Sequence, residues 1–143
     1  MHPSEYDKDF YAWTIHNAEL IRQKKFQEID VAHIAEELES MGKSEKRELA
    51  SRLAVLIAHL LKWQHQPARR GKSWKFTIKA QRIALLRLFN ESPSLKYEIN
   101  ALADSYEEAI LFTASETGLD ENAFADTCPF SLEECLNKDF FPT

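Results

Sequence analysis

The residues best suited to metal or acid–base chemistry are a few histidines and glutamates in the first half of the chain. His33 and Glu36 stand three positions apart, so on a helix they would share a side and could ligate one ion. A carboxylate-bridged two-metal bundle needs such a pair on each of two helices, with glutamates from two more. Here the pair occurs once and in the reverse order. His33, Glu36 and His59 are therefore weak metal candidates, and we expect no cofactor.

The remaining nucleophiles and bases give little sign of catalysis. His59 and His65 are six residues apart, so on one helix they diverge by about 120° and cannot chelate together. We expect His59 to donate to a neighbouring carboxylate at the edge of an apolar stripe. Cys128 and Cys135 have no sequence context that lowers a thiol pKa, and two cysteines are more typical of reduced packing residues than of a disulfide framework. The pattern favours a non-catalytic protein over an enzyme.

The strongest chemical signal is a stretch without carboxylates. Residues 49–90 contain nine lysines and arginines and no aspartate or glutamate. Residues 1–48 hold 11 acids and 7 bases, and residues 91–143 hold 12 acids and 2 bases. The net charge of −5 therefore conceals blocks of −4, +9 and −10, and such asymmetry says more about partners than the total does.

Six bases of this stretch form a predicted surface for an anion or an acidic partner: Arg69, Arg70, Lys72, Lys75, Lys79 and Arg82. The last three follow helical spacing and form one stripe. The first three lie at the start of that helix, where free N–H groups and the helix dipole favour anions. Trp63 and Trp74 flank the connector between the third and fourth predicted helices, and their rings could stack on a nucleic-acid base.

Three interpretations of this surface remain open. The bases could pair internally with acidic faces of the helices predicted near residues 36–39 and 98–108, because surface pairs of about 0–1 kcal/mol each favour one helix arrangement. They could meet an acidic protein or a second copy of the chain. They could also bind nucleic acid, although the net acidity argues against a dedicated nucleic-acid binder.

Apolar periodicity predicts helices along most of the chain. The expected helices cover residues 6–21, 30–42, 44–66, 73–89 and 92–118, with a short segment opened by the capping box Ser131-x-x-Glu134. Gly42 and Gly118 are expected to end helices, Ser73 to cap one, and Ser92-Pro93 to start one.

Each helix has an apolar face that should be buried. The second helix is expected to bury Val31, Ile34, Ala35, Leu38 and Met41. The third, central helix carries a seam of alternating four- and three-residue steps: Leu49, Leu53, Leu56, Leu60 and Trp63. The fifth carries Leu95, Ile99, Leu102, Tyr106 and Ile110.

Length and composition agree with a single helical domain over residues 1–143. Hydrophobic residues make up 44% of the 143 and charged ones 29%, and only three glycines argue against a turn-rich β design. The fold class is therefore all-α: an antiparallel bundle of about five helices with a short C-terminal helical segment. No apolar run approaches the roughly 20 residues of a membrane span, and the first residues lack a secretory pattern. We expect a cytoplasmic protein without a membrane partner.

Several motifs, in order, resemble one bacterial family. They are Phe10-Tyr-Ala-Trp13, Ala35-Glu-Glu-Leu-Glu-Ser-Met-Gly42, His59-Leu-Leu-Lys-Trp-Gln-His-Gln-Pro67, Ser73-Trp74 with Thr77-Ile78 and Arg82, Ser92-Pro-Ser-Leu95 and Asp139-Phe-Phe-Pro142. Together they are similar to domain of unknown function 29, over nearly the whole chain. The resemblance implies a small bacterial all-α protein, and it brings no activity, substrate or catalytic residue.

From the residues, the favoured hypothesis is a non-catalytic interaction module that meets an acidic partner, or its own second copy, through the basic connector and the stripe. The alternatives are a nucleic-acid-binding protein and a metal-dependent helical-bundle enzyme.

Overall fold

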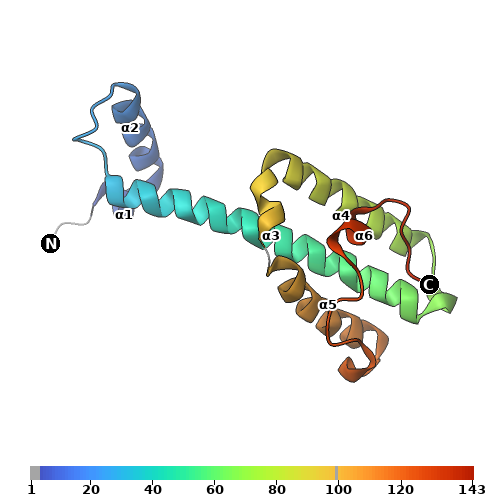
Figure 1. The fold of residues 1–143 in the computed structure, drawn as a ribbon. Coiled ribbons are helices and arrows are strands. Elements are labelled where there is room, and N and C mark those ends of the chain that lie inside the picture. The colour runs from blue at the N-terminus through green and yellow to red at the C-terminus, as the bar shows by residue number, and fades with distance from the viewer. Residues whose placement is uncertain (1–3, 99) are drawn as a thin grey trace. The chain divides into compact units, whose positions relative to one another are not determined.

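The computed structural model describes residues 4–98 and 100–143, and this part of the chain contains helices and no strand (Figure 1). The α-helices are α1 (Glu5–Lys8), α2 (Phe10–Arg22), α3 (Val31–His65), α4 (Lys72–Glu91), α5 (Ala101–Thr117) and α6 (Leu132–Leu136). Short 3-10 helices cover Pro67–Arg69, Pro93–Tyr97 and Glu121–Ala123. The all-α prediction is confirmed. None of these helices is long and apolar enough to cross a bilayer.

The chain divides into an N-terminal unit, Met1–Ser44, and a C-terminal unit, Glu45–Thr143. Each is described by itself below, and α3 contributes residues to both. The single domain over residues 1–143 stays a prediction.

The predicted first helix is in fact two helices. Asp9 has a non-helical backbone and its carboxylate accepts a hydrogen bond from the Ala12 N–H at 3.0 Å, so it caps a new helix that begins at Phe10. Asp9 lies inside the predicted first helix, yet it marks the start of α2. Apolar periodicity alone does not show such a start.

The helix stop predicted at Gly42 is wrong. α3 continues through Gly42, so the predicted second and third helices are one, and four helices of seven or more residues are found in the described chain instead of five. A glycine inside a helix costs only about 1 kcal/mol relative to alanine, which good helix formers on both sides can outweigh. A Cβ at Gly42 would meet no atom within 4 Å, so packing does not require glycine there.

The ends of α4 and α5 also differ from the prediction. α4 begins at Lys72 after Gly71, so Ser73 is not its cap. Ser92-Pro93 opens a 3-10 helix, and α5 begins only at Ala101; Ile99 of the predicted apolar face lies outside the described residues. Gly118 ends α5 with φ +76°, as predicted. The capping box that starts α6 is confirmed as well.

The core of the C-terminal unit is built on the predicted seam of α3. All five seam residues from Leu49 to Trp63 are buried. Against them pack Ile78, Leu85 and Phe89 of α4 and the aromatic end of the chain.

α5 contacts α3 through small residues. Ser105, Ala109 and Thr113 follow one another at four-residue steps and are fully buried. The Ser105 and Thr113 hydroxyls donate to the Ala50 and Ala58 carbonyls of α3, at 3.0 and 3.3 Å. Small side chains let two helix backbones approach closely, and the hydroxyls then reach the facing carbonyls.

This close approach gives a stability prediction. Ala109→Leu should lower the free energy of unfolding by about 1–3 kcal/mol, because three extra carbons have no room in a filled interface. Thermal denaturation should show the loss as a lower Tm. Ala103→Leu, at an exposed position of the same helix, is the control and should change stability little. Equal melting temperatures for the two variants would contradict the close packing.

Candidate interaction surface

An open pocket of about 500 Å³ lies between α4 and the C-terminal segment, within the C-terminal unit. Figure 1 shows this segment, coloured red, beside α4, and α6 contacts α4 directly. Apolar side chains from both elements line the pocket: Ile78, Ile83, Leu86, Leu136 and Phe141. Lys75, Lys79 and Lys138 add positive charge, and Asp139 is the acid in this lining. The lining is therefore about half apolar, and its charged members are mainly cationic.

The lysines of α4 have no carboxylate partner within the described residues, although the Lys75 ammonium lies 5.7 Å from the centroid of the Trp63 ring. Lys72, Lys75 and Lys79 are exposed, and within the described residues no carboxylate lies within 4 Å of their ammonium groups, Asp139 included. The same holds for Arg69. Of the acid-free stretch, Arg52 pairs with Glu48 at 3.0 Å and Lys62 with Glu116. Internal ion pairs therefore involve two bases of the acid-free stretch that lie outside the predicted surface. They involve none of the four exposed bases Arg69, Lys72, Lys75 and Lys79.

Arg82 does not fit the prediction that it belongs to an exposed binding stripe. It is only 3% exposed, and its guanidinium donates to four backbone carbonyls of the C-terminal segment. The shortest of these bonds, both 2.7 Å, reach Cys135 and Phe140. The others reach Glu134 at 3.4 Å and Lys138 at 3.5 Å. Arg82 therefore caps the C-terminal end of α6 and holds one wall of the pocket.

The tryptophans and Arg70 also have structural roles. Trp63 is 9% exposed and packs on Phe141 with ring centroids 4.9 Å apart, so it offers no platform for a base. The Arg70 guanidinium donates to the Trp63 carbonyl at 2.6 Å and lies 5.2 Å from the indole centroid. Trp74 is half-buried. Arg69, Lys72, Lys75 and Lys79 are the predicted cations that stay exposed.

The apolar part of this surface was not predicted from the sequence. Phe76, Ile83 and Leu86 are exposed on the same arc of α4 as Lys72 and Lys79. At 100° per residue they fall on the side opposite Leu85 and Leu88, so a second apolar stripe was readable in the sequence.

The role of Arg82 yields a prediction. Arg82→Met keeps much of the side-chain length but leaves four carbonyls without their donor, so it should lower the free energy of unfolding by about 2–4 kcal/mol. Hydrogen exchange should also show earlier exchange in residues 134–141. Arg87→Met, at an exposed site on the same helix, is the control. Native-like stability and hydrogen exchange in the Arg82 variant would show that these hydrogen bonds do not stabilise residues 134–141.

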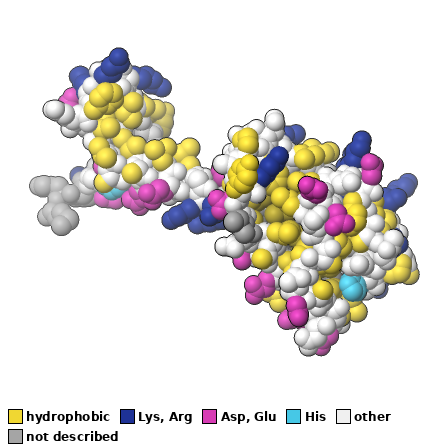
Figure 2. Space-filling model, viewed as in Figure 1, with side chains coloured by type: hydrophobic (Ala, Val, Ile, Leu, Met, Phe, Trp, Pro, Cys, Tyr) yellow, Lys and Arg dark blue, Asp and Glu magenta, His cyan; other side chains and the backbone are white. Residues whose placement is uncertain are grey.

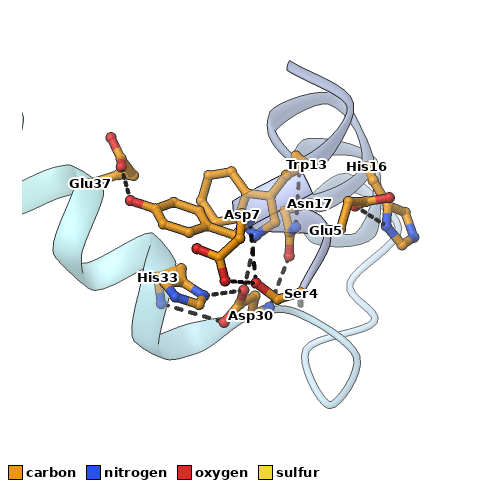
Figure 3. Close-up of polar contacts among 10 residues, drawn as sticks. Ser4, Glu5, Asp7, Trp13, His16, Asn17, Asp30, His33 and Glu37 are labelled. Carbon is orange, nitrogen blue, oxygen red and sulfur yellow. Dashed lines mark hydrogen bonds and ion pairs between the residues drawn. The ribbon is translucent and has the colours of Figure 1, made fainter. Parts of the chain in front are cut away.

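The metal candidate His33 lies in a polar network of the N-terminal unit (Figure 3). Its ring Nδ1 is 2.7 Å from the Asp30 carboxylate, which also accepts from the Trp13 indole N–H at 2.9 Å. The side-chain oxygen of Asn17 accepts a hydrogen bond from the backbone N–H of Asp30 at 2.8 Å. The Tyr6 ring stacks on His33 with centroids 3.9 Å apart. This network ties α1 and α2 to the start of α3.

The hydrogen bonds of this network shift the pKa values of His33, Asp30 and Tyr6. The hydrogen bond to Asp30 raises the pKa of His33 above its ordinary 6.5. The bonds from His33 and Trp13 lower the pKa of Asp30. Tyr6 donates to the Glu37 carboxylate, and this bond raises the Tyr6 pKa to about 12. The arrangement stabilises an imidazolium–carboxylate pair at the start of a helix, which explains His33 without a metal.

These directions define a pH window for the N-terminal unit. The stabilisation from His33 is fully present below pH 6.5 and is lost as pH rises through its raised pKa. That from Asp30 is present above pH 3.8 and is lost as pH falls through its lowered pKa. NMR titration of the His33 ring should give a pKa above 6.5, and Asp30→Asn should reduce it. Glu39→Gln on the same helix is the control, and identical titration of His33 in native and Asp30→Asn proteins would contradict the pairing.

The other candidates do not assemble a reactive centre. The ring Nδ1 of His59 lies 2.9 Å from the Val55 carbonyl of its own helix, so the expected carboxylate partner is wrong, and burial lowers its pKa. Both cysteines are free thiols, and burial raises the pKa of Cys135 to about 12 and also raises that of Cys128. Among residues 4–98 and 100–143, no cluster of three or more histidines, cysteines and acids could hold a metal.

The fold and this surface define an all-α protein with a pocket between α4 and the C-terminal segment, lined by apolar and mainly cationic side chains. The chain belongs to the family described as domain of unknown function DUF29, which matches residues 5–141. The predicted resemblance is thereby confirmed. No curated protein and no solved structure matches the chain.

Proposed function

We propose that this protein is a non-catalytic interaction module whose α4 surface binds an acidic, partly apolar segment of a protein. The observation that carries the proposal is the group Lys72, Lys75 and Lys79, exposed on a helix and without a carboxylate partner in the described chain, beside an apolar pocket. Unpaired charges on a rigid element raise association rates and select complementary partners. The cytoplasm remains the proposed location.

The apolar part of the surface favours a protein segment over nucleic acid. A phosphate backbone would use the lysines alone, whereas Ile83 and Leu86 gain only from contact with apolar side chains. The buried Trp63 is also not available as the stacking platform that the sequence suggested for a single strand. An amphipathic helix with acidic residues beside its apolar stripe matches both features.

The proposal is tested with a labelled amphipathic peptide that carries leucines on one face and glutamates beside them. The full-length protein should bind it, and Lys75→Glu with Lys79→Glu should weaken binding about tenfold or more, since each 1.4 kcal/mol lost is a factor of ten. Fluorescence anisotropy measures the affinity. The control, Lys25→Glu with Arg47→Glu, has the same net charge and changes two exposed bases elsewhere.

Two results would overturn the proposal. One is an equal loss of affinity in the two double variants, which would indicate only a net-charge effect. The other is Lys75- and Lys79-dependent binding of single-stranded RNA, with a steep salt dependence, in place of the peptide.

A further inference from the structure

The first part of α3 carries an apolar stripe that stays exposed. Val31, Leu38 and Met41, which the sequence predicts to be buried, are each 63–65% exposed. With the half-buried Ile34 they follow steps of three, four and three residues. This is the spacing of a helix-pairing seam. Figure 2 shows hydrophobic side chains gathered on the surface of the N-terminal unit.

The charge around this stripe is negative. Residues 31–42 contain Glu36, Glu37 and Glu39 and no lysine or arginine. Glu37 lies directly beside the stripe, and Glu39 lies on its other side, further round the helix. The segment is thus an amphipathic helix of the acidic kind that the α4 surface fits.

The outer face of α4 repeats the same spacing with the opposite charge. Phe76, Lys79, Ile83 and Leu86 follow steps of three, four and three residues. The three apolar members are 50–74% exposed. Lys75 lies directly beside this stripe, and Lys72 precedes it by one turn. The two stripes therefore have equal length and complementary charge.

We infer that α4 of one copy binds residues 31–41 of a second copy of this chain, with the two helices antiparallel. The inference rests on the proposed function, because it names the acidic segment that the same surface binds. In the antiparallel register Val31 lies opposite Leu86, Ile34 opposite Ile83, and Met41 opposite Phe76.

The antiparallel direction follows from the charges. In this register Leu38 lies opposite Lys79 and packs on the aliphatic part of its side chain, so the Lys79 ammonium comes within one residue step of Glu37. Lys75 lies on the same side of the helix pair as Glu37, about five residues further along it. A parallel pair would instead move Glu37 and Glu39 toward Ile83. The antiparallel order also places the positive N-terminal end of each helix dipole beside the negative C-terminal end of the other.

Cysteine pairing between two different variants tests the inference. Protein carrying Ile34→Cys is mixed with protein carrying Ile83→Cys under mild oxidation. A disulfide-linked species of twice the 16.6 kDa chain mass should form between the two variants, because the pair faces across the interface. Mass spectrometry of the linked peptides identifies the sites. Leu111→Cys, exposed on α5, replaces Ile83→Cys in the control mixture and should not cross-link.

Charge reversal links the test to the lysines. Lys75→Glu with Lys79→Glu, added to the Ile83→Cys protein, should remove most of the mixed disulfide. An Ile34→Cys protein that links mainly to itself, or a mixture that yields no linked dimer, overturns the second copy as partner. If the acidic peptide still binds in a Lys75- and Lys79-dependent way, the proposed function stands with another partner. If peptide binding is also insensitive to the lysines, both proposals fail.

Discussion

The pocket depends on the hydrogen bonds of one buried guanidinium. Arg82 reaches four carbonyls contributed by the end of α6 and the residues after it, and so holds Leu136 and Phe141 opposite α4. A buried charge is costly unless its donors are satisfied, and here carbonyl dipoles at a helix C-terminus take the place of a carboxylate. The planar fork of five N–H donors suits this task, whereas the ammonium of a lysine could not reach four acceptors so spread out.

α4 therefore presents different chemistry on each side. Its inner face contributes Ile78, Leu85 and Phe89 to the core, and Arg82 sits at the edge of that face. Its outer face carries lysines at the start and apolar residues toward the end. Because residues 49–90 contain no acid, the outer lysines find no partner on their own helix before Glu91.

Local signals in the sequence predicted local structure well. The α3 seam, the left-handed Gly118 and the Ser131–Glu134 capping box each depend on residues within one or two turns, and each is confirmed. Gly42 failed as a stop because a single weak helix former inside a long helix is tolerated. The burial of Arg82 was not predictable, because its acceptors are backbone carbonyls 52–58 residues further along the chain, and backbone acceptors leave no side-chain pattern.

The exposed stripe at the start of α3 is a second disagreement over burial, and it is informative in itself. Val31, Leu38 and Met41 have the spacing of buried residues, yet within the N-terminal unit they remain open, while Trp13 and Leu20 are covered. A regular apolar stripe is unfavourable in water, so a helix that keeps one exposed gains stability when another surface covers it. α4 has a stripe of the same spacing with charged residues of the opposite sign beside it. Since both stripes belong to the same chain, they are always present at equal concentrations. The mismatch between pattern and burial therefore indicates that this stripe gains from a covering surface outside the N-terminal unit, and this indication is independent of the basic residues.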